Sequence, residues 1–253
     1  MGLDLILTDA DEADAAAVAI EYIPAVTRGL LGWWSPAVSA EEGTRNFYLD
    51  GGAAGAISGT VIFAAGYATF SSGVGVLQTD IAETDNMTLM TWARSMATFA
   101  DPANSPLLAG NLRTTSGVGL TLRKAALGTP APTAQACFYG YVNSAGTPTS
   151  QLATVDVTDA TVWDCYSGVV EAGVGVRIKA HKSGKTGARA TALPRLLNTA
   201  DKIQIGNNTF PNWGGSADIP LGVIHNVALT DAERDAQYLS GNAFLAARRG
   251  IVV

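Results

Sequence analysis

Charged residues are scarce in this sequence of 253 residues, and basic ones are the scarcer. Only 15% of the residues are charged, whereas roughly 25% is usual for a globular protein. The 16 Lys and Arg are outnumbered by 22 Asp and Glu, which gives a formal net charge of −6. Proteins that bind nucleic acid carry a basic surplus, so this balance argues against that class of partner.

Long apolar runs and a targeting segment are missing as well. No run approaches the roughly 18 apolar residues that cross a membrane. Acidic residues occupy the start of the chain, where a secretory signal would place basic residues followed by an apolar stretch. We therefore expect synthesis in a cytoplasm without a signal peptide, and no insertion into a membrane.

Cysteine and histidine occur only twice each, which limits the available chemistry. Cys137 and Cys165 lie far apart and show no metal-ligand spacing, so we expect two buried free thiols. His225 lies on an alternating apolar segment and is expected to be buried, whereas His181 lies in a basic segment and is expected in solvent. The sequence has no G-x-S-x-G turn and no strand of alternating carboxylates of the kind that glycoside hydrolases use. No catalytic residue and no metal ligand is therefore predicted.

Glycine, in contrast, is plentiful, with 28 residues. From Gly29 onward, short apolar or alternating segments are separated by Gly, Pro, Asn, Asp and Ser, as in chains of many strands joined by turns. No helical pattern alternates with them, which argues against a parallel α/β sheet. We predict an all-β fold with one main domain. The expected strands are residues 58–63, 74–81, 87–94, 107–111, 118–124, 136–143, 161–169, 174–180, 202–206 and 219–229.

Helix signals stand at both ends of the chain. Thr8 precedes four acidic residues, which suit the positive end of a helix dipole. The stripe of small residues that follows makes this helix either a docking element or a helix packed on its own domain. Near the other end, Thr230 and Glu233 match the S/T-x-x-E capping box, and Gly241 is expected to end the regular part of that helix.

Several segments follow one another in an informative order. Residues 29–34 read Gly-Leu-Leu-Gly-Trp-Trp, residues 86–94 read Asn-Met-Thr-Leu-Met-Thr-Trp-Ala-Arg, and residues 203–206 read Ile-Gln-Ile-Gly. Trp163 is followed by Val-Val-Glu-Ala-Gly-Val-Gly-Val-Arg-Ile at 169–178. Residues 217–234 read Ala-Asp-Ile-Pro-Leu-Gly-Val-Ile-His-Asn-Val-Ala-Leu-Thr-Asp-Ala-Glu-Arg, and Tyr238 follows. Together these segments resemble the concanavalin A-like jelly-roll superfamily, in the branch of laminin G and pentraxin domains.

The resemblance covers about residues 30–238 and implies a two-sheet antiparallel jelly roll closed by a short helix. The helix signal before Gly29 and the tail after Tyr238 fall outside the resemblance. We predict an N-terminal helical docking or oligomerisation segment at 1–28, a jelly-roll domain at 29–240 and a C-terminal tail at 241–253. Four tryptophans match packing positions of the family and are expected in the core. They are Trp33, Trp34, Trp92 and Trp163.

The sequence departs from the family pattern at its end. His225 stands where the family has an aromatic residue, and Pro220 interrupts the last strand, which predicts an edge or a bulge there. Asp218 has no acidic cluster around it, so the calcium ligands of the family cannot be carried over. We predict no cofactor; calcium stays open, without identified ligands.

Jelly rolls of this kind commonly bind sugars, and a sugar site combines an aromatic ring with amides that bond hydroxyls. The loop 206–215 offers that mixture, in Asn207, Asn208, Asn212 and Trp213. The alternative is that the asparagines form turns and Trp213 covers a sheet edge. A second candidate set is Tyr139, Tyr141 and Asn143. Alternation places both tyrosines on one face, where core packing is an equal alternative.

Seven of the 16 basic residues lie between residues 177 and 202. They form either a solvated loop region or a surface that pairs with a neighbouring subunit or an anionic glycan.

A low-charge jelly roll without a catalytic set looks like a bacteriophage virion protein of a tail fibre, a baseplate or a capsid decoration. We expect its N-terminal segment to dock into a homo-oligomer, a trimer, and its jelly roll to bind carbohydrate on the host surface. One alternative is a purely structural assembly or decoration protein that binds neighbouring virion subunits. The other is a glycoside hydrolase.

Overall fold

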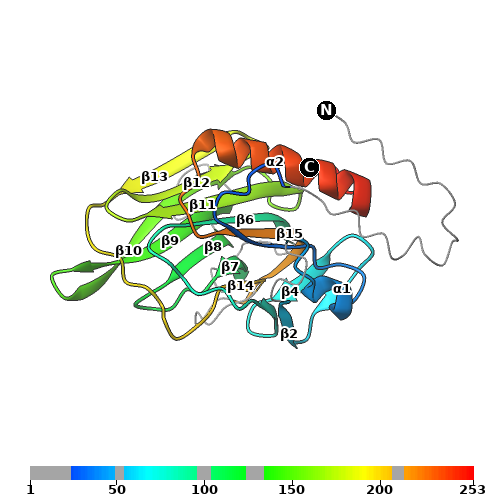
Figure 1. Ribbon diagram of the computed structural model, residues 1–253, viewed down its shortest axis with the longest axis horizontal. Coiled ribbons are helices and arrows are strands. Elements are labelled where there is room, and N and C mark those ends of the chain that lie inside the picture. Colours follow the sequence, from blue (N-terminus) through cyan, green and yellow to red (C-terminus); the bar gives the residue numbers. More distant parts are fainter. Residues whose placement is uncertain (1–23, 49–53, 96–103, 124–133, 207–213) are drawn as a thin grey trace, which may run out of the picture.

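The computed structural model describes residues 24–48, 54–95, 104–123, 134–206 and 214–253. Within them, two antiparallel β-sheets pack face to face, and one long helix lies across the outer face of the first sheet (Figure 1). The predicted all-β sandwich is therefore confirmed. In this part of the chain no helix is both long and apolar enough to cross a membrane.

Sheet I is the sheet that carries the long helix. Its strands follow the order β13 (Lys185–Ala190), β12 (Gly175–Ala180), β11 (Asp164–Glu171), β6 (Met87–Ser95), β15 (Ser216–His225), β4 (Ala68–Ser71) and β3 (Ile62–Phe63), and β1 (Leu30–Trp34) also pairs with β15. A short helix, α1 (Ala40–Thr44), follows β1.

Sheet II forms the second layer. Its strands follow the order β10 (Thr147–Val157), β9 (Ala134–Ser144), β8 (Val118–Arg123), β7 (Leu107–Gly110), β14 (Gln204–Ile205), β5 (Gly75–Gln78) and β2 (Ala56–Gly59).

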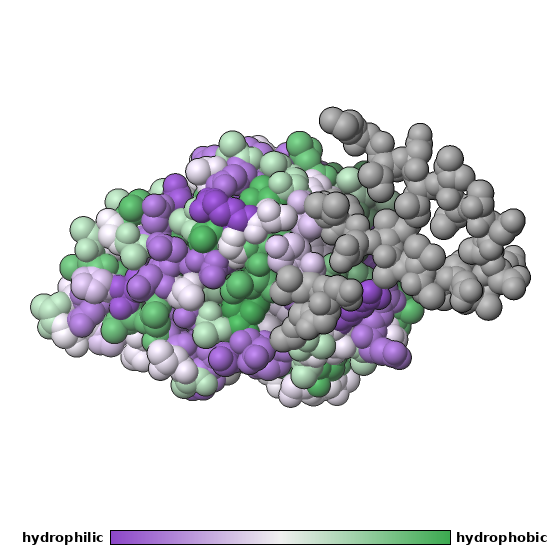
Figure 2. Space-filling model, in the orientation of Figure 1, coloured by the Kyte–Doolittle hydropathy of each residue, from purple (hydrophilic) through white to green (hydrophobic). Residues whose placement is uncertain are grey.

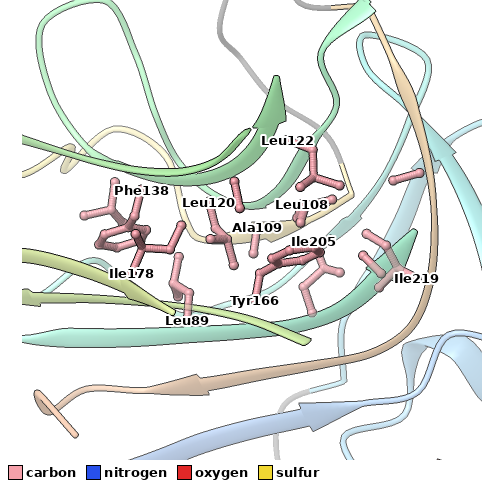
Figure 3. Close-up of a cluster of buried hydrophobic side chains, with 14 of the residues drawn as sticks. Leu89, Leu108, Ala109, Leu120, Leu122, Phe138, Tyr166, Ile178, Ile205 and Ile219 are labelled. Carbon is pink, nitrogen blue, oxygen red and sulfur yellow. The ribbon is translucent and has the colours of Figure 1, made fainter. Parts of the chain in front are cut away.

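The main core lies between the sheets, where alternate residues of each strand point inward (Figure 3). Leu89 and Ile178 come from sheet I, Leu120 and Phe138 come from sheet II, and all four are completely buried. A second apolar cluster lies between sheet I and the long helix. It contains Trp33, Met90, Trp92, Cys165, Leu221, Val223, Phe244 and Leu245.

The long helix is α2 (Asp231–Arg249), and it begins with the predicted capping box between Thr230 and Glu233. The expected end at Gly241 is wrong, because α2 continues to Arg249 and includes most of the predicted tail. A Cβ atom on Gly241 would lie 2.1 Å from the Trp92 ring. This glycine therefore allows close approach of helix and sheet instead of ending the helix.

The predicted core tryptophans and the predicted irregularity at Pro220 both lie within the described residues. Trp33, Trp34 and Trp92 are buried as expected, whereas Trp163 is only partly buried. Opposite β6, the register of β15 shifts between Asp218 and Leu221, which confirms the bulge predicted at Pro220.

Most of the predicted N-terminal helix lies outside the described residues. Residues 24–28 are not helical, and they contact α2 of the same chain. The backbone N–H of Val26 donates to Oε1 of Gln237 at 3.0 Å, and Arg28 forms an ion pair with Glu233.

Both cysteines are buried free thiols, as predicted. Cys137 lies on β9, and Cys165 lies on β11 beneath α2. Burial raises the pKa of Cys137 to about 12 and holds the pKa of Cys165 well above its usual value.

Candidate functional site

A pocket of about 160 Å³ lies between the β10–β11 connection and the β12–β13 turn. This volume is well below the roughly 300 to 1,000 Å³ of a drug-sized site, so the pocket suits one small ring or group. Its lining combines apolar side chains, hydroxyls and charges: Val157, Thr158, Asp159, Val162, Asp164, Lys182 and Ser183.

Asp164 is the most buried polar residue of this pocket, with 6% of its surface exposed. Its Oδ1 accepts the backbone N–H groups of Cys165 at 2.7 Å and Lys182 at 2.8 Å, which ties the start of β11 to the β12–β13 turn. Its Oδ2 has no hydrogen-bond partner among the described residues. Burial raises the pKa of Asp164, against the effect of these hydrogen bonds and of the Lys182 charge. The pocket therefore holds a rigid carboxyl group with one acceptor atom free.

Asp159 supplies the second carboxylate of the pocket, from the exposed side. Its Oδ1 accepts the backbone N–H of Thr161 at 2.8 Å and the Thr161 hydroxyl at 2.6 Å, and these bonds lower the pKa of Asp159. The Nζ atom of Lys182 donates to the Trp163 carbonyl at 3.3 Å. The two carboxylates and this lysine are thus each held by the chain around the pocket.

Trp163 stands in the sequence between two pocket residues, Val162 and Asp164, but its ring belongs to another cluster. The Arg94 guanidinium lies 4.4 Å from the centre of the Trp163 ring and 5.2 Å from that of Tyr67. The Nε atom of Arg94 donates to Oδ2 of buried Asp218 at 2.9 Å. A cation already occupies one face of the Trp163 ring, so that face is not available to a ligand.

The predicted set Tyr139, Tyr141 and Asn143 is placed on β9. The hydroxyl of half-buried Tyr139 accepts from Nη1 of Arg123 at 2.8 Å, and Tyr141 is buried in a small cluster with Leu107 and Leu112. Oδ1 of Asn143 accepts the N–H of Gly146 at 2.7 Å, within the β9–β10 turn. These side chains hold strand and turn, and Tyr139 packs against the same cluster as Tyr141. Their role in binding stays a prediction.

The other predicted residues lie outside the described residues. They are Asn207, Asn208, Asn212 and Trp213. Their role in binding stays a prediction.

The sequence suggested that His181 lies in solvent. The residue is instead buried under α2. Its Nε2 lies 2.9 Å from the Ser167 hydroxyl and its Nδ1 lies 3.2 Å from Oδ1 of Asp235, while the Tyr238 ring stacks on it at 4.9 Å. This order of groups resembles a serine hydrolase triad. Ser167, however, is completely buried and accepts a hydrogen bond from Arg234 at 3.0 Å. Its hydroxyl cannot reach a substrate, so the arrangement fastens the helix to the sheet.

Three members of the basic segment are paired inside the chain. Arg177 pairs with Glu171 at 2.9 Å, Lys179 pairs with Asp235 at 2.6 Å, and buried Arg195 pairs with buried Glu83. These three residues therefore follow neither predicted alternative, because their partners are carboxylates of the same chain. No group of three or more metal-ligating side chains occurs in the described parts of the chain.

The pocket was missed from the sequence because its two halves are separate in the chain. The strand expected at 161–169 begins only at Asp164, which leaves 158–163 as a connection. The spacing of Asp159 and Thr161 is a turn signal that could have shown this boundary. Contact between that connection and the turn at Lys182 has no sequence signal.

Figure 2 shows hydrophilic and hydrophobic residues interspersed over the described part of the visible face. Such a mixed surface suits a polar ligand better than a broad apolar partner.

Neither a protein-family profile nor a curated protein sequence matches this chain. Solved structures of similar fold do match. The binding domain of botulinum neurotoxin serotype D aligns with a TM-score of 0.59 at 10% identity, over 84% of this chain and 51% of that one. The binding domain of serotype G aligns with a TM-score of 0.59 at 12% identity, over 85% of this chain and 51% of that one. The binding domain of botulinum neurotoxin DC in complex with SialylT aligns with a TM-score of 0.59 at 11% identity, over 84% of this chain and 51% of that one. The chain spans about half the length of these domains and shares with that half the two-sheet fold.

Proposed function

We propose that the chain is a non-catalytic carbohydrate-binding module of a bacteriophage virion protein, which binds sugars on the host surface. One observation carries the binding part: a pocket that holds the free Oδ2 of Asp164 beside the apolar side chains of Val157 and Val162. Sugar hydroxyls donate to carboxylates, and sugar C–H groups pack on apolar side chains. The virion part rests on composition and on the jelly-roll resemblance.

The fold comparison supports this proposal without naming a ligand. The similar solved structures are binding domains, and one of them is in complex with SialylT. Two sheets of this kind are thus part of binding domains in other proteins.

A glycan array probed with the intact chain tests the proposal. The informative variant is Asp164→Asn, because its Oδ1 still accepts the N–H groups of Cys165 and Lys182 while its amide nitrogen replaces the free acceptor. We expect the wild type to bind a defined set of glycans and this variant to bind them about tenfold more weakly or worse. Asp156→Asn, an exposed position on β10, is the matched control and should bind like the wild type.

Two further measurements complete the glycan-array experiment. Since the pocket's acceptors are protein carboxylates, binding should persist in EDTA, and loss of binding there would indicate a calcium site instead. Trp213→Ala reports on the loop at 206–215. Absence of any glycan signal from the wild type would contradict the proposed function.

The structural alternative has one observation in its favour. Leu239 on α2 is 65% exposed and Val252 is 81% exposed, so the helix side of the molecule presents apolar side chains. A chain that assembles with neighbouring subunits and binds no glycan would support this second function.

A further inference from the structure

We infer that the pocket bounded by Asp159, Asp164 and Lys182 takes the single terminal ring of an uncharged glycan and discriminates against glycans that end in an acidic sugar. This inference rests on the proposed function and names the ligand class of the same site.

The size of the pocket argues for one ring. The pocket has a volume of about 160 Å³ and lies between two short segments, the β10–β11 connection and the β12–β13 turn. A groove for an internal stretch of polysaccharide would need a row of adjoining subsites, whereas this hollow offers one among the described residues. Its size therefore suits the end of a chain.

The polar groups argue for a ligand rich in hydroxyls. Asp164 is buried, its position is fixed by two backbone N–H groups, and its Oδ2 stays without a partner among the described residues. Oδ2 is not among the fully buried polar atoms, so a hydroxyl donor of a ligand can reach it and replace water there. Oδ2 of Asp159 adds a second acceptor at the exposed rim, and the ammonium group of Lys182 adds a donor.

The charges argue against an acidic ligand. Two carboxylates line the pocket against one lysine, and the hydrogen bonds from Thr161 keep Asp159 ionised by lowering its pKa. A ligand carboxylate or sulfate would meet like charge at short range. Val157 and Val162 complete the lining, and Val162 is 43% exposed, so the C–H face of a neutral ring can lie against it.

Matched glycans test the inference with the intact chain. The probes are one oligosaccharide that ends in a neutral hexose found by the array, the same oligosaccharide capped with sialic acid, and the same one extended by a further neutral sugar. Titration calorimetry gives each affinity. We expect the two probes that end in a neutral ring to bind and the sialylated probe to bind about tenfold more weakly or worse.

Variants at Asp159 separate charge from shape. Asp159→Asn keeps the oxygen that accepts from Thr161 and should reduce the discrimination against the sialylated probe. Asp159→Lys reverses the charge at an exposed position and should shift the preference toward that probe. Thr186→Ala, at an exposed position on β13 outside the pocket, is a matched control that changes no charge, and it should keep the wild-type order of affinities. Thermal unfolding of each variant checks that the fold is retained.

The outcomes are distinguishable. Equal affinity for neutral and sialylated ends would overturn the inference and leave the proposed function standing. Glycan binding that ignores Asp164→Asn and Asp159→Lys but is lost in Trp213→Ala would do the same, because the site would then be the 206–215 loop. If the wild type binds none of the probes or array glycans, both the inference and the proposed function fail.

Discussion

Both histidines are buried, and burial lowers the pKa of each to about 4. His225 is completely buried, with Nδ1 3.0 Å from the Arg28 carbonyl. For His181, the positive charges of Arg234 and Lys179 add to the effect of burial, while Asp235 opposes it. Each imidazole is therefore neutral in the folded protein at neutral pH.

This has a consequence for stability in acid. An unfolded histidine has a pKa near 6.5, so below that pH the unfolded chain binds protons that the folded chain does not. The free energy of unfolding should fall as the pH drops from about 6.5 toward 4, by about 2 kcal/mol per histidine between pH 7 and 5. Urea denaturation at the two pH values measures the change.

Replacing one histidine isolates its share. His225→Asn keeps a donor for the Arg28 carbonyl, and His181→Gln keeps an acceptor for the Ser167 hydroxyl. Each variant should show a change between pH 7 and 5 that is about 2 kcal/mol smaller than in the wild type. An unaltered pH dependence would show that the replaced imidazole is already protonated in the folded state.

For single residues, the sequence predicts burial where burial follows from the local pattern of apolar residues. Strand alternation was enough to place His225 in the interior, but His181 is covered by Tyr238 from a helix far along the chain. The role of Asp164 was missed for the same reason as the burial of His181. Its partner, the backbone N–H of Lys182, lies in the turn between two other strands. Such contacts exist only after the sheets and α2 have packed.

Among the elements, α2 is distinguished by its close contact with sheet I at Gly241. In an exposed helix, Gly→Ala stabilises by about 1 kcal/mol. Here the new methyl group would lie 2.1 Å from the Trp92 ring, so we expect Gly241→Ala to lower the free energy of unfolding by about 1 to 3 kcal/mol. Denaturation curves compared with exposed Ala246→Gly, which should cost about 1 kcal/mol, provide the control. A stabilised Gly241→Ala protein would mean that helix and sheet are further apart.

The segment between β13 and β14 is held by the buried ion pair of Arg195 and Glu83, whose Oε2 also accepts the Asn198 N–H at 2.8 Å. Removing one partner leaves a buried charge without compensation. Arg195→Met should therefore lower the free energy of unfolding by about 3 to 5 kcal/mol, whereas exposed Arg189→Met should stay within about 0.5 kcal/mol of the wild type. Thermal and urea unfolding measure both, and equal stabilities would show that the pair adds nothing.

Strand prediction failed where an element carries few buried apolar residues. β13 is exposed along almost its whole length, and the first half of β10 is polar. Both lie at sheet edges, where only one neighbour and one partly solvated face constrain the sequence. Central strands such as β6 are buried throughout, and the sequence predicted that strand almost to the residue.

For the whole molecule, assembly is the prediction still to be tested. Residues 24–28 contact α2 of their own chain, so the N-terminal docking hypothesis now concerns residues 1–23. Deleting 1–23 should reduce the molar mass measured by light scattering from that of a trimer to that of one chain, with the glycan affinity per chain retained. An unchanged mass would remove the docking hypothesis.

The order of segments along the chain was sufficient to predict the sandwich, because each core strand carries its own apolar pattern. The candidate pocket was not predictable in the same way. It forms where the β10–β11 connection meets the β12–β13 turn, and neither segment has a pattern that refers to the other.

The position of Cys165 beneath α2 gives the protein an internal reporter. A thiol in that position reacts with an alkylating reagent only when the helix leaves the sheet, whereas Cys137 waits for β9 to become accessible. Cys137 lies on the outer face of sheet II, because its neighbours Ala136 and Phe138 point into the core between the sheets. The labelling rates of the two thiols would therefore distinguish detachment of α2 from exposure of that outer face, in the unmodified chain and without an added probe.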